Sequence, residues 1–148
     1  MEDVKQVYPG CIRKNTYAPN GEYFSSPGDY EPLLRSFGHE ILLKIDDDDY
    51  QGDSRLILKD GERYGLLIFG WGSCSGCDAL QACESYEDIS KLRNQLQSQI
   101  IWKESPSEML TFLKDRDWKK EYSWRDGKTK DFVAQAIALL ENLAPDSK

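Results

Sequence analysis

Apolar side chains occur in short continuous runs in the first half of the chain and at helical spacing in the second half. The runs over residues 40–46, 54–60 and 63–70 are rich in Ile and Leu and are bounded by charged residues or glycine, which predicts three strands. The dipeptide Asp60-Gly61 separates the last two runs and is a strong signal for a β-hairpin turn. We therefore expect an antiparallel sheet with one face to cover.

The second half of the chain carries start signals for helices. Ser85 is followed three residues later by Asp88, and Ser105 is followed by Pro106 and Glu108; both are typical of helix N-termini. Helices here would cover the apolar face of the sheet, so the predicted fold class is α+β, a small antiparallel sheet of three or more strands packed against C-terminal helices. The expected helices span residues 78–83, 85–100, 105–113 and 130–143, and residues 101–102 and 118–124 are expected as strands.

The length of 148 residues is that of one domain, and we predict a single domain over residues 1–148. Residues 1–29 are rich in proline and glycine. We expect them to form an irregular N-terminal arm with turns at its Asn-Gly and Pro-Gly pairs. A short helix follows, which Asp29 caps and Gly38 ends.

Three cysteines lie close together in the segment after the third predicted strand. Cys74, Cys77 and Cys83 are spaced C-x2-C-x5-C, and glycines before and between them allow the tight backbone that lets thiols converge. Two thiols at C-x2-C spacing can chelate one tetrahedral ion, which indicates a zinc site. The candidates for the fourth ligand are Cys11 and His39, the one histidine of the chain, with Asp78 as the alternative for a site of the catalytic type.

Two other interpretations of this segment stay open. Cys74 or Cys77 at the N-terminus of a helix would have its thiolate stabilised by the helix dipole. The chain would then be a thiol- or metal-dependent enzyme in which Asp78 supplies a carboxylate and Trp71 lines the site, and a dyad of His39 with one of these thiols would be nucleophile and base. In the third interpretation the cysteines are small buried side chains of a glycine-rich turn, and no disulfide pairing is assigned.

The cysteine segment also carries a resemblance. The stretch Trp-Gly-Ser-Cys-Ser-Gly-Cys-Asp-Ala-Leu over residues 71–80, preceded by Tyr64-Gly65 and followed by Cys83, resembles a core found in small uncharacterised proteins of bacteria and their phages. The resemblance extends over residues 45–125. It implies no function for this chain, so it marks the segment as a candidate site without supplying a chemistry.

The second candidate site is acidic. Asp46, Asp47, Asp48 and Asp49 are consecutive, and Asp53 follows them. The spacing is close to that of an EF-hand, but the twelfth position is a leucine where a bidentate glutamate is required, and the flanks are predicted strands. We interpret the run as a patch that docks a basic partner. An irregular Mg2+ or Ca2+ site and a solvated loop are the alternatives.

Composition narrows the classes of partner. The chain has 19 basic and 26 acidic residues, a net charge of -7 and a pI near 4.8. This argues against nucleic acid or an anionic membrane, because both favour a basic surface. The chain shows no secretory signal and no apolar run long enough for a membrane span, so we expect a cytoplasmic protein. The predicted function is a non-enzymatic acidic module that binds a protein, of the inhibitor or immunity type, with the thiol- or metal-dependent enzyme as the alternative.

Overall fold

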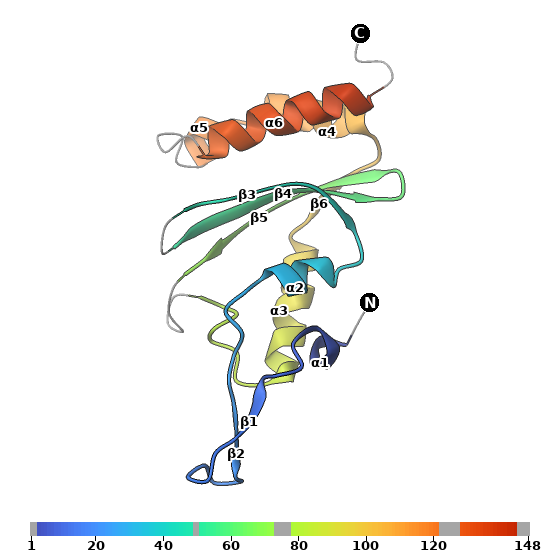
Figure 1. Cartoon of the computed structure of the whole chain (residues 1–148). Helices are drawn as coiled ribbons and strands as arrows, with labels where there is room; N and C mark the ends of the chain where they lie inside the picture. Colours follow the sequence, from blue (N-terminus) through green and yellow to red (C-terminus); the bar gives the residue numbers. More distant parts are fainter. Residues whose placement is uncertain (1–2, 49–50, 73–77, 122–127, 145–148) are drawn as a thin grey trace. The chain divides into compact units, whose positions relative to one another are not determined.

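The structure is a computed structural model, and it describes residues 3–48, 51–72, 78–121 and 128–144 (Figure 1). The chain forms two compact units. The hairpin unit consists of Met1–Gly38 and Gly70–Gln99, and the sheet unit consists of His39–Phe69 and Ile100–Lys148. That the whole chain acts as a single domain stays a prediction.

The sheet unit is built on a four-stranded antiparallel sheet in which consecutive strands are neighbours. The three predicted strands are confirmed, and the strand expected at residues 101–102 joins the sheet with Trp102 opposite Gly65. The turn before the third of these strands uses Gly61 at φ 62°, a left-handed conformation that glycine adopts without a Cβ clash. The strands are β3 Glu40–Asp46, β4 Gly52–Asp60, β5 Arg63–Trp71 and β6 Ile101–Lys103.

Two helices, α4 (Pro106–Asp115) and α6 (Lys128–Leu143), lie side by side over one face of this sheet (Figure 1). The start predicted for α4 is confirmed: the Ser105 hydroxyl accepts the N–H of Glu108 at 3.1 Å, and the Glu108 carboxylate accepts the N–H of Glu104 at 2.8 Å. The predicted α+β class is therefore confirmed. The core here includes seven side chains that are each at most 2% exposed: Ile57, Leu66, Met109, Leu113, Phe132, Ala136 and Leu140.

The strands β4 and β5 are buried on both faces. Ile57 and Leu66 belong to the core under the helices. Leu56, Leu58 and Leu67 alternate with them, and so point to the opposite face, yet each is at most 1% exposed. Burial on both faces explains why these strands appear in the sequence as continuous apolar runs rather than as alternating ones.

In its described part, the hairpin unit contains three helices and a two-stranded antiparallel sheet. The predicted helix after residue 29 is confirmed over Glu31–Arg35, and Gly38 follows it at φ 81°. Its N-cap is Tyr30, and the predicted cap Asp29 lies one residue earlier, where its carboxylate accepts the N–H of Glu31 at 3.0 Å. Residues 1–29 were predicted to form an irregular arm, but they contain one helix and both strands of the two-stranded sheet. Each of these elements has three or four residues. Such elements are too short to show a periodic pattern of apolar positions in the sequence. The elements are α1 Val4–Val7, β1 Ile12–Lys14, β2 Glu22–Phe24, α2 Glu31–Arg35 and α3 Tyr86–Ser98.

The first turn of α3 confirms the capping box predicted at Ser85. The Ser85 hydroxyl accepts the N–H of Asp88 at 3.1 Å, and the Asp88 carboxylate accepts the N–H of Glu84 at 2.9 Å. This cap holds Ser85 in an extended conformation with φ -161° and ψ 164°. The helix predicted at residues 78–83 was wrong, because the chain has to become extended before α3 begins, and residues 79–82 form a turn.

The strand predicted at residues 118–124 was also wrong in its described part. Trp118–Glu121 form the short helix α5, because the Asp117 carboxylate accepts the N–H of Lys120 at 3.3 Å and caps the turn. The rest of that strand lies outside the described residues. Across the described ranges, no helix is long and apolar enough to cross a membrane.

Candidate functional site

Asp78 is a buried carboxylate beside the cysteine segment, and it is 4% exposed. Its Oδ1 accepts hydrogen bonds from the Tyr30 hydroxyl at 3.0 Å and from the backbone N–H of Leu80 and Gln81 at 2.9 and 3.0 Å. Its Oδ2 accepts the backbone N–H of Gly72 at 2.9 Å. Four donors around one carboxylate satisfy a charge that would otherwise be costly to bury.

These bonds hold together the two ends of the segment that carries Cys74 and Cys77. Gly72 and Asp78 lie on either side of residues 73–77, and the Gln81 side chain also donates to the Gly72 carbonyl at 3.0 Å. Cys74 and Cys77 themselves lie outside the described residues. Asp78 is thus an anchor for the ends of the segment, and using it as a base or ligand would require it to release hydrogen bonds. Its catalytic role in the enzyme alternative stays a prediction.

Cys11 and Cys83 are buried in the hairpin unit at 4% and 8% exposure. The Cys83 thiol donates to the Ala79 carbonyl at 3.4 Å. Burial, reinforced by the negative charges of Asp88 and Asp78, raises the pKa of Cys83 to about 11, and burial raises the pKa of Cys11 as well. A raised pKa keeps a thiol protonated at neutral pH, which is the opposite of an activated nucleophile.

The zinc site predicted at Cys74, Cys77 and Cys83 stays a prediction. Among residues 3–48, 51–72, 78–121 and 128–144, no three His, Cys, Asp or Glu side chains are arranged to hold one metal ion. Two of the three thiols lie outside these ranges. Of the two candidates for the fourth ligand, Cys11 belongs to the same unit as Cys83 and His39 belongs to the sheet unit.

His39 packs against the aromatic ring of Trp102 at the start of β3. The ring centroids are 4.9 Å apart and the planes meet at 78°. The His39 Nδ1 lies 3.9 Å from the Asp60 carboxylate, which also pairs with Arg63 at 2.7 Å. That hydrogen bond from Arg63 lowers the pKa of Asp60. His39 is therefore a packed side chain beside an ion pair, and its dyad with a thiol stays a prediction.

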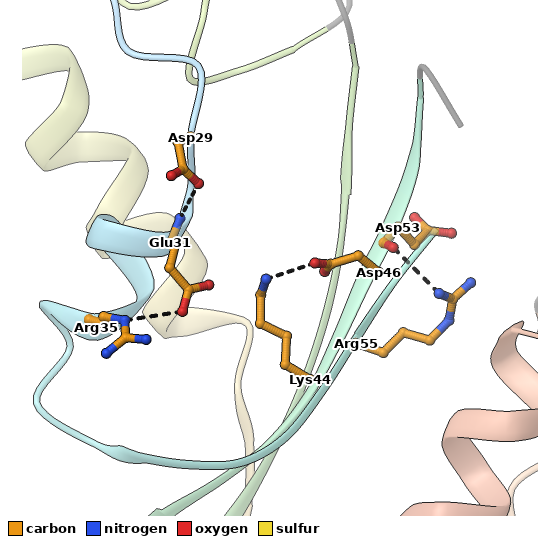
Figure 2. A network of polar contacts seen from close by, with 7 residues as sticks. All are labelled: Asp29, Glu31, Arg35, Lys44, Asp46, Asp53 and Arg55. Atoms are coloured by element: carbon orange, nitrogen blue, oxygen red, sulfur yellow. Dashed lines mark hydrogen bonds and ion pairs between the residues drawn. The ribbon is translucent and has the colours of Figure 1, made fainter. Parts of the chain in front are cut away.

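The acidic loop between β3 and β4 contains a buried ion pair. Arg55 of β4 is 2% exposed, and its Nη1 donates to the Asp47 Oδ1 at 3.0 Å. The same Nη1 donates to the Asp53 carbonyl at 3.4 Å (Figure 2). Its Nε donates to the Thr129 hydroxyl at 3.1 Å. The Asp47 Oδ2 accepts the N–H of Asp53 at 2.8 Å. Asp47 and Arg55 thus close the loop and connect β4 to α6.

The neighbouring carboxylates of this loop also meet cations of the same unit. Asp46 pairs with Lys44 at 2.7 Å (Figure 2), and Asp48 pairs with Lys128 at 2.9 Å, where the hydrogen bond raises the pKa of Lys128. Asp49 lies outside the described residues. The Asp48 side chain is 85% exposed. A basic partner at Asp46–Asp49 and Asp53 stays a prediction, but much of the negative charge described here is compensated within the chain.

Sequence reasoning missed an apolar surface on the hairpin unit. We call residues 12–24, which include β1, β2 and the turn between them, the hairpin surface. Ile12 is 50% exposed, Tyr17 96% and Tyr23 42%. The signal in the sequence was three large apolar side chains within a stretch rich in turn residues, where no periodic element needed them for a core.

A groove lies beside the hairpin surface. It has a volume of about 570 Å3, and the Phe24 ring meets the Tyr86 ring edge to face at 5.3 Å between centroids. Lys5 and Glu84 bring opposite charges to its rim. An apolar groove with a few polar groups at its edge is a common form of binding surface. The lining residues are Lys5, Pro9, Ile12, Phe24, Glu84, Ser85 and Tyr86.

No family model, curated protein or solved structure matches the chain.

Proposed function

We propose that this chain is a non-enzymatic protein-binding module of the cytoplasm, of the inhibitor or immunity type, and that the hairpin surface is where it binds. The observation that carries the proposal is that three large apolar side chains of one short hairpin, Ile12, Tyr17 and Tyr23, are 42–96% exposed. Large apolar side chains that several positions of one surface element leave exposed are candidates for contact with a partner. Tyrosine is enriched at such interfaces because it buries a large ring and keeps a polar tip.

The charge of the chain supports a protein partner. A net charge of -7 disfavours nucleic acid and anionic membranes. The acidic loop is a second surface with which a basic region of the partner would interact. Because Asp46, Asp47 and Asp48 already pair with cations of the sheet unit, we place the main contact on the hairpin surface and assign the loop a steering role.

The test is photo-crosslinking followed by titration. A photoreactive amino acid replaces Tyr17 in cells that express the chain, and the same amino acid replaces Glu87, a 79% exposed side chain of α3, as the matched control. The cross-linked protein is then identified, purified and titrated by calorimetry against the unmodified chain, Tyr17→Ala and Glu87→Ala. We expect Tyr17→Ala to weaken binding by about tenfold or more and Glu87→Ala to leave it unchanged.

Two outcomes would contradict the proposal. One is an adduct that forms from position 87 and not from position 17. The other is a purified partner that binds Tyr17→Ala as tightly as the unmodified chain.

A second candidate function is the thiol- or metal-dependent enzyme. The observation in its favour is that Asp78, a buried carboxylate next to Cys77 in sequence, accepts the N–H of Gly72 at 2.9 Å. The test combines metal analysis of tag-free protein with a titration of reactive thiols. About one zinc per chain, together with a loss of stability of several kcal/mol in Cys77→Ser, supports a structural metal beside the binding function. One thiol that alkylates fast at neutral pH supports the enzyme.

A further inference from the structure

The hydrogen-bond pattern of the two-stranded sheet shows which backbone groups face outward. The backbone N–H of Ser25 donates to the Cys11 carbonyl at 2.7 Å, and the backbone N–H of Asn15 donates to the Gly21 carbonyl at 2.9 Å. The pair of Arg13 and Tyr23 lies two positions along the ladder from each of these bonded pairs. Hydrogen-bonded and non-hydrogen-bonded pairs alternate in an antiparallel ladder. The backbone N–H and C=O groups of the intervening residues on β1, Ile12 and Lys14, therefore point away from β2.

The outer edge of β1 is accessible and basic. Ile12, Arg13 and Lys14 are all exposed, and Arg13 and Lys14 place two cations on this edge. The Ile12 and Lys14 side chains lie on the face that also holds Phe24 and the groove, whereas Arg13 lies on the other face, because side chains alternate along a strand. Exposed strand edges with free backbone groups are templates for an added strand.

Two other edges in the described part of the chain, those of β2 and β3, suit an added strand less well. On β2, the carboxylate of Glu22 would repel the acidic segment that the two cations of β1 favour. On β3, Lys44 already pairs with Asp46, and the register shifts between Ile41 and Leu43 as in a β-bulge. Bulges protect an edge from further pairing.

We propose that the hairpin surface takes an extended segment of its protein partner as a third strand, added antiparallel along β1. The segment carries two acidic residues followed by an apolar one. This inference rests on the proposed function, since it uses the same surface, and it adds the chemistry of the partner.

The register follows from the strand geometry. An antiparallel strand meets Lys14, Arg13 and Ile12 in that order along its own direction. Opposite charges that face each other across strands stabilise the pair, as do apolar neighbours. The first two partner residues are therefore acidic, and the third is apolar and lies next to the groove at Phe24. Arg13 and Lys14 also discriminate against basic segments, because like charges repel each other.

The first experiment selects the segment without assuming a partner. A phage-displayed library of random peptides is panned on the full-length chain, and enriched peptides are synthesised and measured by fluorescence anisotropy. We expect enrichment of acidic-acidic-apolar triplets. The charge reversals Arg13→Glu and Lys14→Glu, on opposite faces of β1, should each weaken binding by about tenfold. The matched control Lys91→Glu, at a 73% exposed lysine of α3, should bind like the unmodified chain.

The second experiment tests for a strand rather than a side-chain contact. Methylating the peptide nitrogen opposite Ile12 or opposite Lys14 removes a ladder hydrogen bond and should weaken binding by about tenfold or more. Methylating the nitrogen opposite Arg13 should have little effect, because that group points away from β1. Equal sensitivity at all three positions, enrichment of basic peptides, an empty selection or binding unaffected by both charge reversals would overturn the inference.

The results also separate this inference from the proposed function. Peptides that lose binding to Tyr17→Ala but show no acidic preference and no alternation on methylation would overturn the added strand and leave the hairpin surface as a binding site. An empty selection together with no specific cross-link from position 17 would overturn both.

Discussion

The sheet unit and the hairpin unit are stabilised in different ways. The sheet unit buries side chains such as Ile57, Phe132 and Leu140 between a sheet and two helices. Each such side chain, fully buried, contributes about 1.5–3 kcal/mol by leaving water. In the hairpin unit, α3 has 13 residues and the elements α1, β1, β2 and α2 have three to five. Buried polar groups connect the short elements: the Tyr8 hydroxyl donates to the Asp29 carbonyl at 2.6 Å, and the Tyr30 hydroxyl donates to Asp78 at 3.0 Å.

Short helices and strands need hydrogen bonds from buried side chains to hold them in place. Strands of three residues and helices of four or five bury little apolar surface, so a few hydrogen-bonded anchors fix the chain between them. The Tyr86 hydroxyl illustrates this, since it donates to the Tyr8 carbonyl at 2.6 Å and accepts the N–H of Cys11 at 3.3 Å. The unit held by such anchors also carries the exposed hairpin surface.

The largest effect is expected at the buried carboxylate of the hairpin unit. Asp78→Ala removes the acceptor of the Tyr30 hydroxyl and of the backbone N–H groups of Gly72 and Gln81, and an unsatisfied buried donor costs about 1–3 kcal/mol. The Leu80 N–H keeps the Tyr30 hydroxyl oxygen, at 3.2 Å, as a second acceptor. We expect the free energy of unfolding to fall by about 4 kcal/mol in urea denaturation. Tyr30→Phe removes one of the four bonds and should cost about 1 kcal/mol. Equal losses in the two variants would contradict the anchor role of Asp78.

The corresponding test in the sheet unit uses two adjacent aspartates. Asp47→Asn removes the carboxylate that faces Arg55, a guanidinium that is 2% exposed, and should cost about 3 kcal/mol because a buried charge loses its partner. Asp48→Asn is the matched control, because the Asp48 side chain is 85% exposed. It should change stability by less than about 0.5 kcal/mol. If both variants unfold at the same urea concentration, the difference drawn between the two carboxylates is wrong.

The buried thiols of the hairpin unit predict slow alkylation. In the unmodified chain, burial raises the pKa of Cys83 to about 11, against 9.0 for an ordinary thiol. The substitutions Cys11→Ser, Cys74→Ser and Cys77→Ser leave Cys83 as the one thiol of the variant chain. It should react with iodoacetamide at pH 8 about a hundredfold more slowly in the folded chain than in the unfolded one. Equal rates would show that the thiol is accessible and ionised.

The same pKa gives a pH dependence with a definite sign. Because the folded pKa of Cys83 is raised, its contribution to stability is fully present below the ordinary thiol pKa of 9.0. The contribution falls as the pH rises from there toward 11, since the unfolded thiol ionises first. The measurement is urea denaturation of this variant and of its Cys83→Ala derivative at pH 8 and pH 10. A parallel pH dependence in both chains would contradict the assignment.

The smallest effects are expected at the helix caps, where the two units should behave alike. Ser85→Ala at α3 and Ser105→Ala at α4 each remove one side-chain cap and should cost about 1 kcal/mol, measured as a lowered melting temperature. Ser107→Ala, one residue inside α4, is the control and should change stability by less than about 0.5 kcal/mol. Caps act within one turn, so a clear difference between the two cap variants would reveal a further role for one serine.

Local signals in the sequence predicted the regular part of the molecule. Apolar runs gave β3, β4 and β5, and the capping boxes at Ser85 and Ser105 gave the starts of α3 and α4. These features depend on residues within one or two turns of each other, so they can be inferred from sequence. The helix predicted at residues 78–83 was wrong because the extended conformation of the Ser85 cap ends the turn at residues 79–82. The helix α5 was missed because the Asp117 cap at Lys120 outweighs a weak pattern.

The sequence by itself therefore determined the α+β class, the strand order of the central hairpin and the candidate residues in the cysteine segment and the acidic loop. Only the tertiary structure decided how those polar residues are used. It gives Asp78 donors from Tyr30 and Gly72 and gives Asp47 a buried partner in Arg55. It also left Tyr17 and Ile12 outside any core. Tyr30 and Asp78 are 48 positions apart in sequence, whereas the bonds from Gly72 to Asp78 and from Arg55 to Asp47 span six and eight positions. Burial sets the energy of all three, so no pattern of apolar positions encodes them.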